Sequence, residues 1–557
     1  MAQRLDDTTI NGTVNEIYEK LKCKIHEAAL ESLGLKTYER CSNYWWTEDL
    51  TEIVKEKKNL YMKWLSTRED EDRKNYNRYK YMVKKEIIRA KNEAWEKKCA
   101  DINSMIGGSR SREAWKTVNS LRRNANEKRK INPIKIEQWE NYYNDLLKEK
   151  RIEYINTEIE KEEVEVDEKD IITLDEIKKA LQAMKNNKAP GPGDLPIELI
   201  KHATAQAQEI IRIIFNKCLS GEEIPRDWKT SYINSIFKKG NRKECSNYRG
   251  ISITSSIGKL YERVLKVRIE KENMEIEEQN GFRPGRSCID NIFTLKQLVE
   301  KRMERGMDLH ITFIDLRKAF DSVPLQKLWT ALRKSNTRDI YINAVKALYK
   351  GNQAFIKVGN KISEPLTQTK GVKQGSCLSP TLFKIYLCWA LKHWMRKCNP
   401  MGIKVDDINI PTILFADDQV VFAEDQQDMV YMLNKLIEEF KKWGLQVNTE
   451  KTKYMHIGGV GQDINLESGV IKHVDKYEYL GVTITNDGRD NEDILKKTGK
   501  GRNMIKALHP ILWNKNLINK TKKNVYQTMV QPVMTYGSET WVINKSMSQK
   551  LLSSEMM

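Results

Sequence analysis

The spacing of apolar and polar positions changes along the chain. Between residues 50 and 130 the sequence is dense in Lys, Arg and Glu, and apolar residues recur at steps of three and four. The members of this stripe are Tyr76, Tyr79, Val83, Ile87, Ala90 and Ala94. The spacing predicts a long amphipathic helix. Its charged face either stays solvated beside an apolar core stripe or contacts nucleic acid, and the pattern leaves both interpretations open.

A second helix is predicted to begin at "TLDE", residues 173–176, which has the T-x-x-E form of a capping box. Ile177, Leu181 and Met184 give it one apolar side, and the Pro and Gly residues of "KNNKAPGPGD" end it. From there onward, short strand-like runs alternate with amphipathic helices, which predicts an α+β body. We expect a basic helical N-terminal extension (1–155), an acidic linker (156–172), an α+β region (173–485) and a helical C-terminal region (486–557).

Composition narrows the class of partner. The 96 Lys and Arg residues exceed the 77 Asp and Glu residues, giving a net charge of +19, which favours a polyanionic partner. The N-terminus has no apolar signal segment, and no run of 18 uncharged apolar residues occurs, so we expect neither secretion nor a membrane partner. The nine cysteines lack C-x-x-C pairs, which favours reduced thiols in an intracellular protein over disulfides or a zinc site.

Carboxylates stand at the ends of two strand-like runs. In "TILFADDQVVFAED" (412–425), Asp417 and Asp418 separate two such runs, and in "LHITFIDLRKAFDSV" (309–323) the run "ITFI" ends at Asp315. Taken alone, an Asp-Asp pair is most often a solvated turn. If the two segments pair in one sheet, Asp315 and Asp417 face each other, and three crowded carboxylates would repel unless divalent cations neutralise them. Two Mg²⁺ ions held by carboxylates and substrate phosphates are typical of phosphoryl transfer.

From residue 170 onward the chain resembles the reverse transcriptases of non-LTR (LINE-type) retrotransposons. The blocks that carry the resemblance occur in the family's order: "NKAPGPGDLPIELIK", "IPRDWKTSYINSIFKKGNRKECSNYRGISITSSIGKLYERV", "EEQNGFRPGRSCIDNIF", "FIDLRKAFDSV", "GVKQGSCLSPTLFKIYL", "FADD", "WGLQVNTEKTKYM", "YEYLGVTIT" and "QPVMTYGSETW". The resemblance implies a right-hand polymerase, with fingers and palm in 173–485 and a truncated helical thumb in 486–557. Residues 1–155 then resemble the helical spacer that follows an upstream endonuclease.

The resemblance also implies roles for particular residues. Asp315, Asp417 and Asp418 match the metal-binding catalytic triad. Phe320, five residues after Asp315, matches a steric gate against the 2′-hydroxyl, although a core aromatic is the alternative. In "KGVKQGSCLSPTLF" the residues expected to line the nucleotide and template base are Gln374 and Gly375, unless this segment is an ordinary loop-to-helix junction.

Basic residues complete the expected site. Lys451 could protonate the departing pyrophosphate, or be one more surface lysine beside Lys453. Cations near glycines could grip triphosphate and template backbone, and among them Arg249 and Arg283 match the family blocks best. For the others, non-specific phosphate contact or a solvated face is the favoured interpretation: Lys238, Lys239, Arg242 and Arg286.

The function that follows from the resemblance is RNA-directed DNA polymerisation: extension of a DNA 3′-end on an RNA template with dNTPs and two Mg²⁺, for which Mn²⁺ could substitute. An RNA-dependent RNA polymerase would share the palm, but "FADD" and Phe320 argue against it. The alternative is a decayed or domesticated copy that binds nucleic acid without polymerising. No endonuclease, zinc knuckle or RNase H segment is found, so a fragment of a longer reading frame with an upstream endonuclease is compatible with the sequence. We expect the cytoplasm and nucleus as its location.

Overall fold

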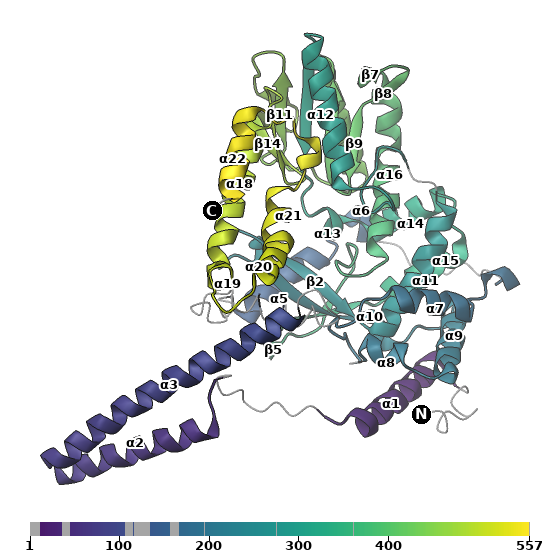
Figure 1. The fold of residues 1–557 in the computed structure, drawn as a ribbon. Coiled ribbons are helices and arrows are strands. Elements are labelled where there is room, and N and C mark those ends of the chain that lie inside the picture. Colours follow the sequence, from purple (N-terminus) through teal and green to yellow (C-terminus); the bar gives the residue numbers. More distant parts are fainter. Residues whose placement is uncertain are drawn as a thin grey trace. The chain divides into compact units, whose positions relative to one another are not determined.

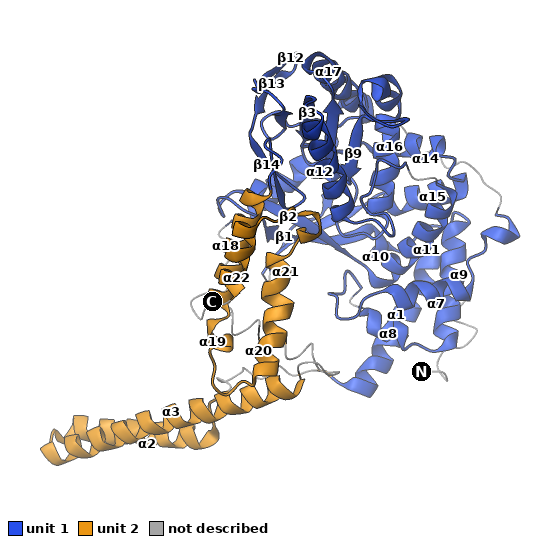
Figure 2. Ribbon diagram, turned by 45° about the horizontal axis from the view of Figure 1, so that its top comes forward, with its two compact units in different colours: residues 1–34, 130–489 blue, residues 35–129, 490–557 orange. Residues whose placement is uncertain are grey.

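The chain folds into two compact units. The computed structural model describes residues 12–35, 45–105, 115, 118, 134–155, 166–193, 195–273, 276–359 and 361–555. Unit 1 comprises Met1–Gly34 and Lys130–Arg489, and unit 2 comprises Leu35–Arg129 and Asp490–Met557 (Figure 2). Residues 156–165 of the expected acidic linker lie outside the described residues.

Unit 2 is helical. Its elements are α2 (Glu48–Thr67), α3 (Asp70–Met105), α18 (Asn491–Ala507), α19 (His509–Leu512), α20 (Asn519–Val525), a π-helical turn (Tyr526–Val530), α21 (Gln531–Met534), a 3₁₀ turn (Ser538–Thr540) and α22 (Lys545–Glu555). The long helix expected from the apolar stripe is α3. Its Cys99 and Ile102 are buried in one core with Ile505, Leu508 and Val525. The two chain segments of unit 2, far apart in sequence, therefore share a hydrophobic core.

Most of the helices belong to unit 1. They are α1 (Val14–Leu33), α5 (Ile136–Leu147), α6 (Ile152–Ile155), α7 (Leu174–Ala183), α8 (Ile197–Lys201), α9 (Ala205–Leu219), α10 (Arg226–Lys229), α11 (Ser256–Glu272), α12 (Cys288–Glu304), α13 (Ala319–Ser322), α14 (Leu325–Lys334), α15 (Asp339–Tyr349), α16 (Ser379–Cys398) and α17 (Gln426–Lys442), with 3₁₀ turns at Glu168–Asp170, Cys245–Asn247 and Asn399–Met401. The capping box expected at "TLDE" is present, because the Thr173 hydroxyl accepts from the Glu176 N–H and the Glu176 carboxylate accepts from the Thr173 N–H.

The central sheet of unit 1 has six strands in the order β12-β13-β11-β3-β10-β9. Figure 1 shows β11 and β9 of this sheet with helix α12 against them. Their bounds are β3 (Leu309–Ile314), β9 (Thr412–Phe415), β10 (Asp418–Ala423), β11 (Lys453–Ile457), β12 (Ile464–Leu466) and β13 (Gly469–His473). Strand β3 is buried along its whole length, and successive side chains alternate between its two faces. Leu309, Ile311 and Phe313 pack in the core that includes α12. Ile314 packs in the core that includes α16 and α17, so helices cover both faces of the sheet.

A second sheet carries β2 (Tyr248–Thr254), β1 (Thr230–Phe237), β4 (Gln353–Val358) and β5 (Lys361–Ile362) in that order, with β6 (Leu366–Thr367) paired to β4. Helix α5 covers it, because Trp139 and Tyr143 share a core with Ile233 of β1 and Tyr248 of β2. Two short hairpins, β7 (Ile403–Val405) with β8 (Ile408–Ile410) and β14 (Lys476–Tyr479) with β15 (Val482–Thr485), complete the described strands. The expected α+β architecture is confirmed.

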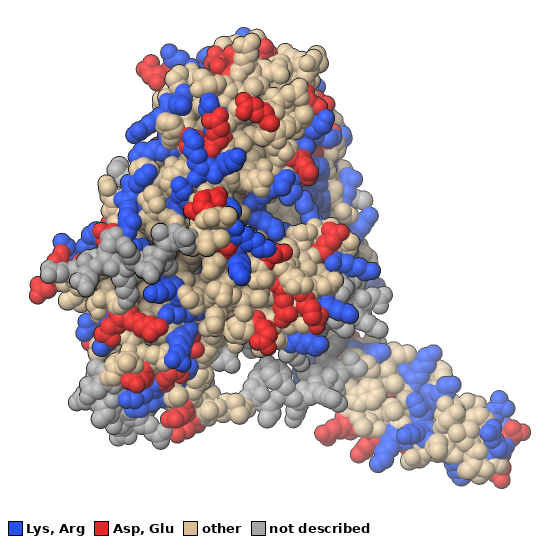
Figure 3. Space-filling model, turned by 180° about the vertical axis from the view of Figure 1, so that it is seen from behind, with Lys and Arg blue, Asp and Glu red and all other residues tan. Residues whose placement is uncertain are grey.

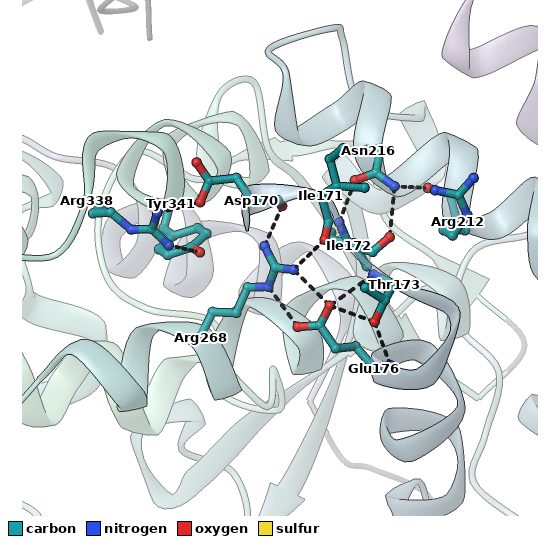
Figure 4. A network of polar contacts seen from close by, with 10 residues as sticks. All are labelled: Asp170, Ile171, Ile172, Thr173, Glu176, Arg212, Asn216, Arg268, Arg338 and Tyr341. Carbon is teal, nitrogen blue, oxygen red and sulfur yellow. Dashed lines mark hydrogen bonds and ion pairs between the residues drawn. The ribbon is translucent and has the colours of Figure 1, made fainter. Parts of the chain in front are cut away.

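A buried arginine anchors the segment that precedes α7. The guanidinium of Arg268 on α11 donates to the Asp170 and Ile171 carbonyl oxygens and forms a two-bond ion pair with Glu176 (Figure 4). Nearby, the Asn216 side-chain amide accepts from the Ile172 N–H at 2.7 Å and donates to the Ile172 carbonyl at 3.0 Å. These bonds provide hydrogen-bond partners for main-chain N–H and carbonyl groups of residues 170–172, which precede α7. None of the described helices is long and apolar enough to cross a membrane.

Candidate active site

Two neighbouring strands bring the three predicted carboxylates together. Strand β10 pairs antiparallel with β3, and the pairing runs to Gln419 opposite Ile314. Asp315 follows Ile314 directly, and Asp418 precedes Gln419, so the register sets these two residues across from each other. Asp417 lies one residue further, in the turn between β9 and β10. The expected pairing of the 309 strand with the 412–423 hairpin is confirmed, and the residue across from Asp315 is Asp418 rather than Asp417.

The main chain around Asp315 is fixed by the segment that follows α17. The Asp315 N–H donates to the Thr452 hydroxyl at 3.2 Å, and the Asp315 carbonyl accepts from the Asn448 N–H at 2.8 Å. The Asn448 carbonyl in turn accepts from the N–H groups of Lys451 and Thr452. This turn presents Lys451, whose Nζ lies 3.9 Å from Asp315 Oδ2 while its side chain stays 68% exposed.

The hairpin carboxylates are held in an environment that disfavours their charged forms. Burial raises the pKa of Asp417, and the charge of Asp315 adds to the rise, while Arg249 and Lys238 oppose it. Burial together with the charges of Asp417 and Asp315 raises the pKa of Asp418 to about 6. Perturbation of this kind, by desolvation and by like charges in a cleft, is typical of functional sites.

The triad opens into a cleft of about 1150 Å³ within unit 1. Eight of the nine site residues expected from the sequence line it: Asp315, Asp417, Asp418, Lys451, Phe320, Gln374, Gly375 and Arg249. Arg283 is absent from the lining, and its guanidinium forms an ion pair with Glu277 at 2.8 Å. These eight residues span about two hundred positions of the sequence, from Arg249 to Lys451.

Phe320 stands at the wall of this cleft. Its ring stacks on Phe383 of α16, with centroids 4.2 Å apart, and meets Phe282 edge-on at 6.5 Å. The side chain is half-buried, and it packs against the core that α16 and α17 share. A half-buried ring on a cleft wall is compatible with both the gate and the core interpretation of Phe320.

Gln374 and Gly375 are fixed by two different neighbours. The side-chain amide of Gln374 donates to both carboxylate oxygens of Asp321 at 2.9 Å, and the main-chain carbonyl of Gln374 accepts from the Ser252 N–H. Gly375 has φ +130°, and a Cβ there would lie 2.3 Å from the Ser252 carbonyl oxygen. Only glycine fits this position, because the loop lies directly against β2.

Several cleft residues escaped the sequence analysis. Helix α5 contributes Tyr142 to the cleft lining. The Lys318 Nζ lies 4.6 Å from the centroid of the Tyr142 ring, and Lys370 and Asp321 also line the cleft. Burial raises the pKa of Asp321 to about 6, although the Gln374 bond and neighbouring lysines oppose the rise. Asp321 and Lys318 stand beside Phe320 in "RKAFD", a signal that could have found them; nothing in the sequence places α5 here.

The donor set suits a hard divalent cation bound together with a substrate. Carboxylate oxygens from Asp315, Asp417 and Asp418 are the ligands that Mg²⁺ prefers. Across the described residues, no three His, Cys, Asp or Glu side chains converge to hold a metal ion by themselves. Mg²⁺ usually keeps several waters and takes one or two carboxylates plus substrate phosphates. The carboxylates thus fit ions that complete their coordination with a bound nucleotide.

The surface charge is distributed. On the face drawn in Figure 3, blue Lys and Arg side chains spread over the molecule with red Asp and Glu side chains among them. On this face the basic side chains are therefore spread over many separate groups, which suits phosphate contacts that carry no sequence information.

Comparison with known proteins finds a family match over part of the chain. Residues 236–484 match the family described as reverse transcriptase (RNA-dependent DNA polymerase). The RNA-directed DNA polymerase from mobile element jockey of Drosophila melanogaster is 24% identical over 387 residues, covering 67% of this chain and 42% of that protein. The Pol polyprotein from the type-2 retrotransposable element R2DM of the same species is 26% identical over 313 residues, covering 54% and 29%.

Solved structures give a more distant match. Apo telomerase from Candida tropicalis is 13% identical, with a TM-score of 0.35, over 58% of this chain and 61% of that one. The chain spans well under half the length of the first curated relatives it matches, 42% and 27%. The segment that matches the reverse transcriptase family contains both strands of the carboxylate site, β3 and β10.

Proposed function

We propose that this chain is an RNA-directed DNA polymerase, which extends a DNA 3′-end on an RNA template using dNTPs. The observation that carries the proposal is the juxtaposition of Asp315, Asp417 and Asp418 at the ends of adjacent strands, at the wall of a cleft that is otherwise rich in Lys and Arg. In this proposal residues 173–485 are fingers and palm, residues 486–557 belong to a helical thumb, and residues 1–155 are an extension. An endonuclease in a longer polyprotein is part of the same proposal.

Asp315 and Asp417 are proposed to hold two Mg²⁺ ions, with Asp418 adjusting the field around them; Mn²⁺ could replace Mg²⁺. Such ions, when bound, stabilise the attacking and leaving oxygens of nucleotidyl transfer. Without a cation the three carboxylates disfavour one another's charge, as the raised pKa values of Asp417 and Asp418 indicate. This repulsion favours entry of a divalent cation, which relieves it.

The remaining cleft residues bind and orient the substrates. Lys238 and Arg249, whose charges act on Asp417, are placed to hold the triphosphate. The Lys451 Nζ lies 3.9 Å from Asp315 Oδ2 and is placed to give a proton to the departing pyrophosphate. Phe320 occupies cleft wall that a 2′-hydroxyl would need, and Gln374, held by Asp321, lines the nucleotide and template. Arg283, paired with Glu277, would contact template only after that pair opens.

Primer extension on poly(rA)/oligo(dT) with dTTP tests the proposal. The full chain should add nucleotides in Mg²⁺, should not do so in EDTA, and should lose the activity on Asp315→Asn. Filter binding of the same primer–template, run in parallel, measures nucleic-acid affinity. Tight binding without extension would refute polymerisation and favour a decayed copy that only binds nucleic acid.

A further inference from the structure

The free edge of β9 is covered by a segment from another part of the fold. The Leu414 N–H donates to the Glu278 carbonyl at 2.8 Å, and the Asn280 N–H donates to the Leu414 carbonyl at 2.9 Å. Gln279 and Leu414 form a parallel bridge. Residues 278–280 therefore act as an added strand beside the edge strand that leads into the Asp417 turn.

The side chain of Gln279 continues this contact onto the turn itself. Its Oε1 accepts from the Ala416 N–H at 2.9 Å, and its Nε2 donates to the Ala416 carbonyl at 3.1 Å. Oε1 also accepts from the Gly281 N–H at 2.8 Å. Gln279 is 1% exposed, so all of these bonds lie away from water. A side-chain amide is suited to this position, because it both accepts and donates.

Ala416, the residue that Gln279 binds, has an unfavourable backbone conformation. Ala416 has φ +59°, in the left-handed region that side chains other than glycine rarely adopt. A conformation of this kind persists when surrounding structure determines it, and it is often found where a functional side chain must be aimed. Ala416 immediately precedes Asp417, so the torsion at Ala416 sets the direction in which the Asp417 backbone leaves the turn.

Close packing leaves the turn no room to move toward the segment. A Cβ at Gly281 would lie 2.1 Å from the Ala416 nitrogen. On its other side, the Asn280 amide donates to Asn291 of α12, whose own amide donates to the Tyr479 hydroxyl at 3.2 Å. Asn280 and Asn291 are both buried. The segment that grips the turn is thus itself fixed to α12 and β14.

We propose that Gln279 is a positioning residue for the catalytic carboxylates: it fixes the strained Ala416 turn and so aims Asp417 at the metal site. The inference rests on the proposed function, because it assigns Gln279 a role in the same metal-dependent reaction. Gln279 touches neither metal nor substrate in this role. Loss of groups that orient metal ligands typically weakens metal affinity or activity about 10- to 100-fold.

The test compares two amide clamps that have the same chemistry. Gln279→Met keeps the side-chain volume and removes both bonds to Ala416. Asn216→Leu removes the equivalent pair of bonds to Ile172, which lies outside the cleft lining (Figure 4). Mn²⁺ binding to the full chain is measured by electron paramagnetic resonance, and amide hydrogen exchange is measured for the 412–420 peptide. Both readouts are independent of polymerase activity.

Gln279→Met should weaken Mn²⁺ binding about 10- to 100-fold and speed exchange at the turn, as expected for a lost orienting group. Asn216→Leu should leave Mn²⁺ affinity and 412–420 exchange unchanged. Mn²⁺ affinity within twofold of wild type in Gln279→Met, or equal loss in both variants, overturns the inference. Failure of the proposed function looks different: wild type would neither bind Mn²⁺ nor extend primers, and both proposals would fall.

A second pair of variants reaches the same contact without altering Gln279. Gly281→Ala would place a methyl group against the Ala416 nitrogen, whereas a Cβ at Gly499 on α18 has no neighbour within 4 Å. Gly281→Ala should therefore reproduce the weakened Mn²⁺ binding, and Gly499→Ala should not. This pair decides the question if Gln279→Met does not fold, and wild-type Mn²⁺ affinity in Gly281→Ala would again overturn the inference.

Discussion

Asp417→Asn should have opposite effects on catalysis and on the stability of the metal-free protein. Asparagine keeps the shape of the side chain and removes its charge. Without that charge a divalent cation loses a ligand, but Asp315 and Asp418 lose a repelling neighbour. A residue that served only to shape the turn would show neither effect, because asparagine is well tolerated in turns.

The structure gives the size and sign of both effects. Loss of the preorganised electrostatic stabilisation of the transition state should lower the rate of primer extension by about 10³-fold or more. Burial and the charges of Asp417 and Asp315 raise the pKa of Asp418 to about 6, so the wild-type chain loses stability as pH rises from about 4 to 6. The Asp417→Asn variant should lose less stability over the same pH range. Part of the Asp418 side chain still meets solvent, so screening limits the gain at neutral pH to at most about 1 kcal/mol.

Two measurements on the same proteins check the reasoning. Primer extension in Mg²⁺ gives the loss of rate, and urea unfolding in EDTA at pH 7 and pH 4 gives the change in stability. Asp406→Asn is the matched control, since Asp406 stands at the tip of the β7–β8 hairpin with φ +52° and lies outside the cleft lining. Near wild-type extension by Asp417→Asn, or unfolding of that variant at neutral pH, would refute the metal role and make Asp417 a scaffold residue.

Three further predictions concern the cleft. Phe320→Ala should lower the kcat/KM ratio of dTTP over UTP by up to about 10²-fold, the discrimination that one hydroxyl in an apolar site can support; an unchanged ratio would make Phe320 a core residue. Since the pKa of Asp321 is raised to about 6, its bond to Gln374 should weaken as pH falls through 6, so the dNTP KM should rise in wild type but not in Asp321→Asn. A pH profile of KM identical in both proteins would contradict this role. Lys451→Met should lower kcat by about 10², whereas Lys453→Met should change it less than twofold, and equal losses would argue against proton transfer from Lys451.

Local patterns determined much of the catalytic centre. The run before Asp315 and the runs around Asp417 and Asp418 have strand-like sequence, and the observed β3, β9 and β10 confirm them. The observed register of β3 and β10, with Gln419 opposite Ile314, brings the carboxylates together. The capping box at Thr173 and the helix around Val83 were also predicted from the sequence, because a helix cap and a helical period depend on residues only a few positions apart.

Contacts between segments distant in sequence were decided only by the tertiary structure. The sequence does not reveal that α5 contributes to the cleft, that α3 shares a core with the last helices, or that Gln279 holds the Ala416 turn. Arg283 has the sequence context of a substrate-binding cation, yet it pairs with Glu277 away from the cleft lining. The physical reason is range: helical periods and caps depend on neighbouring residues, whereas a buried amide or ion pair depends on where packing brings remote segments. The sequence alone thus determined the strands and the three carboxylates, and packing decided what surrounds and aims them.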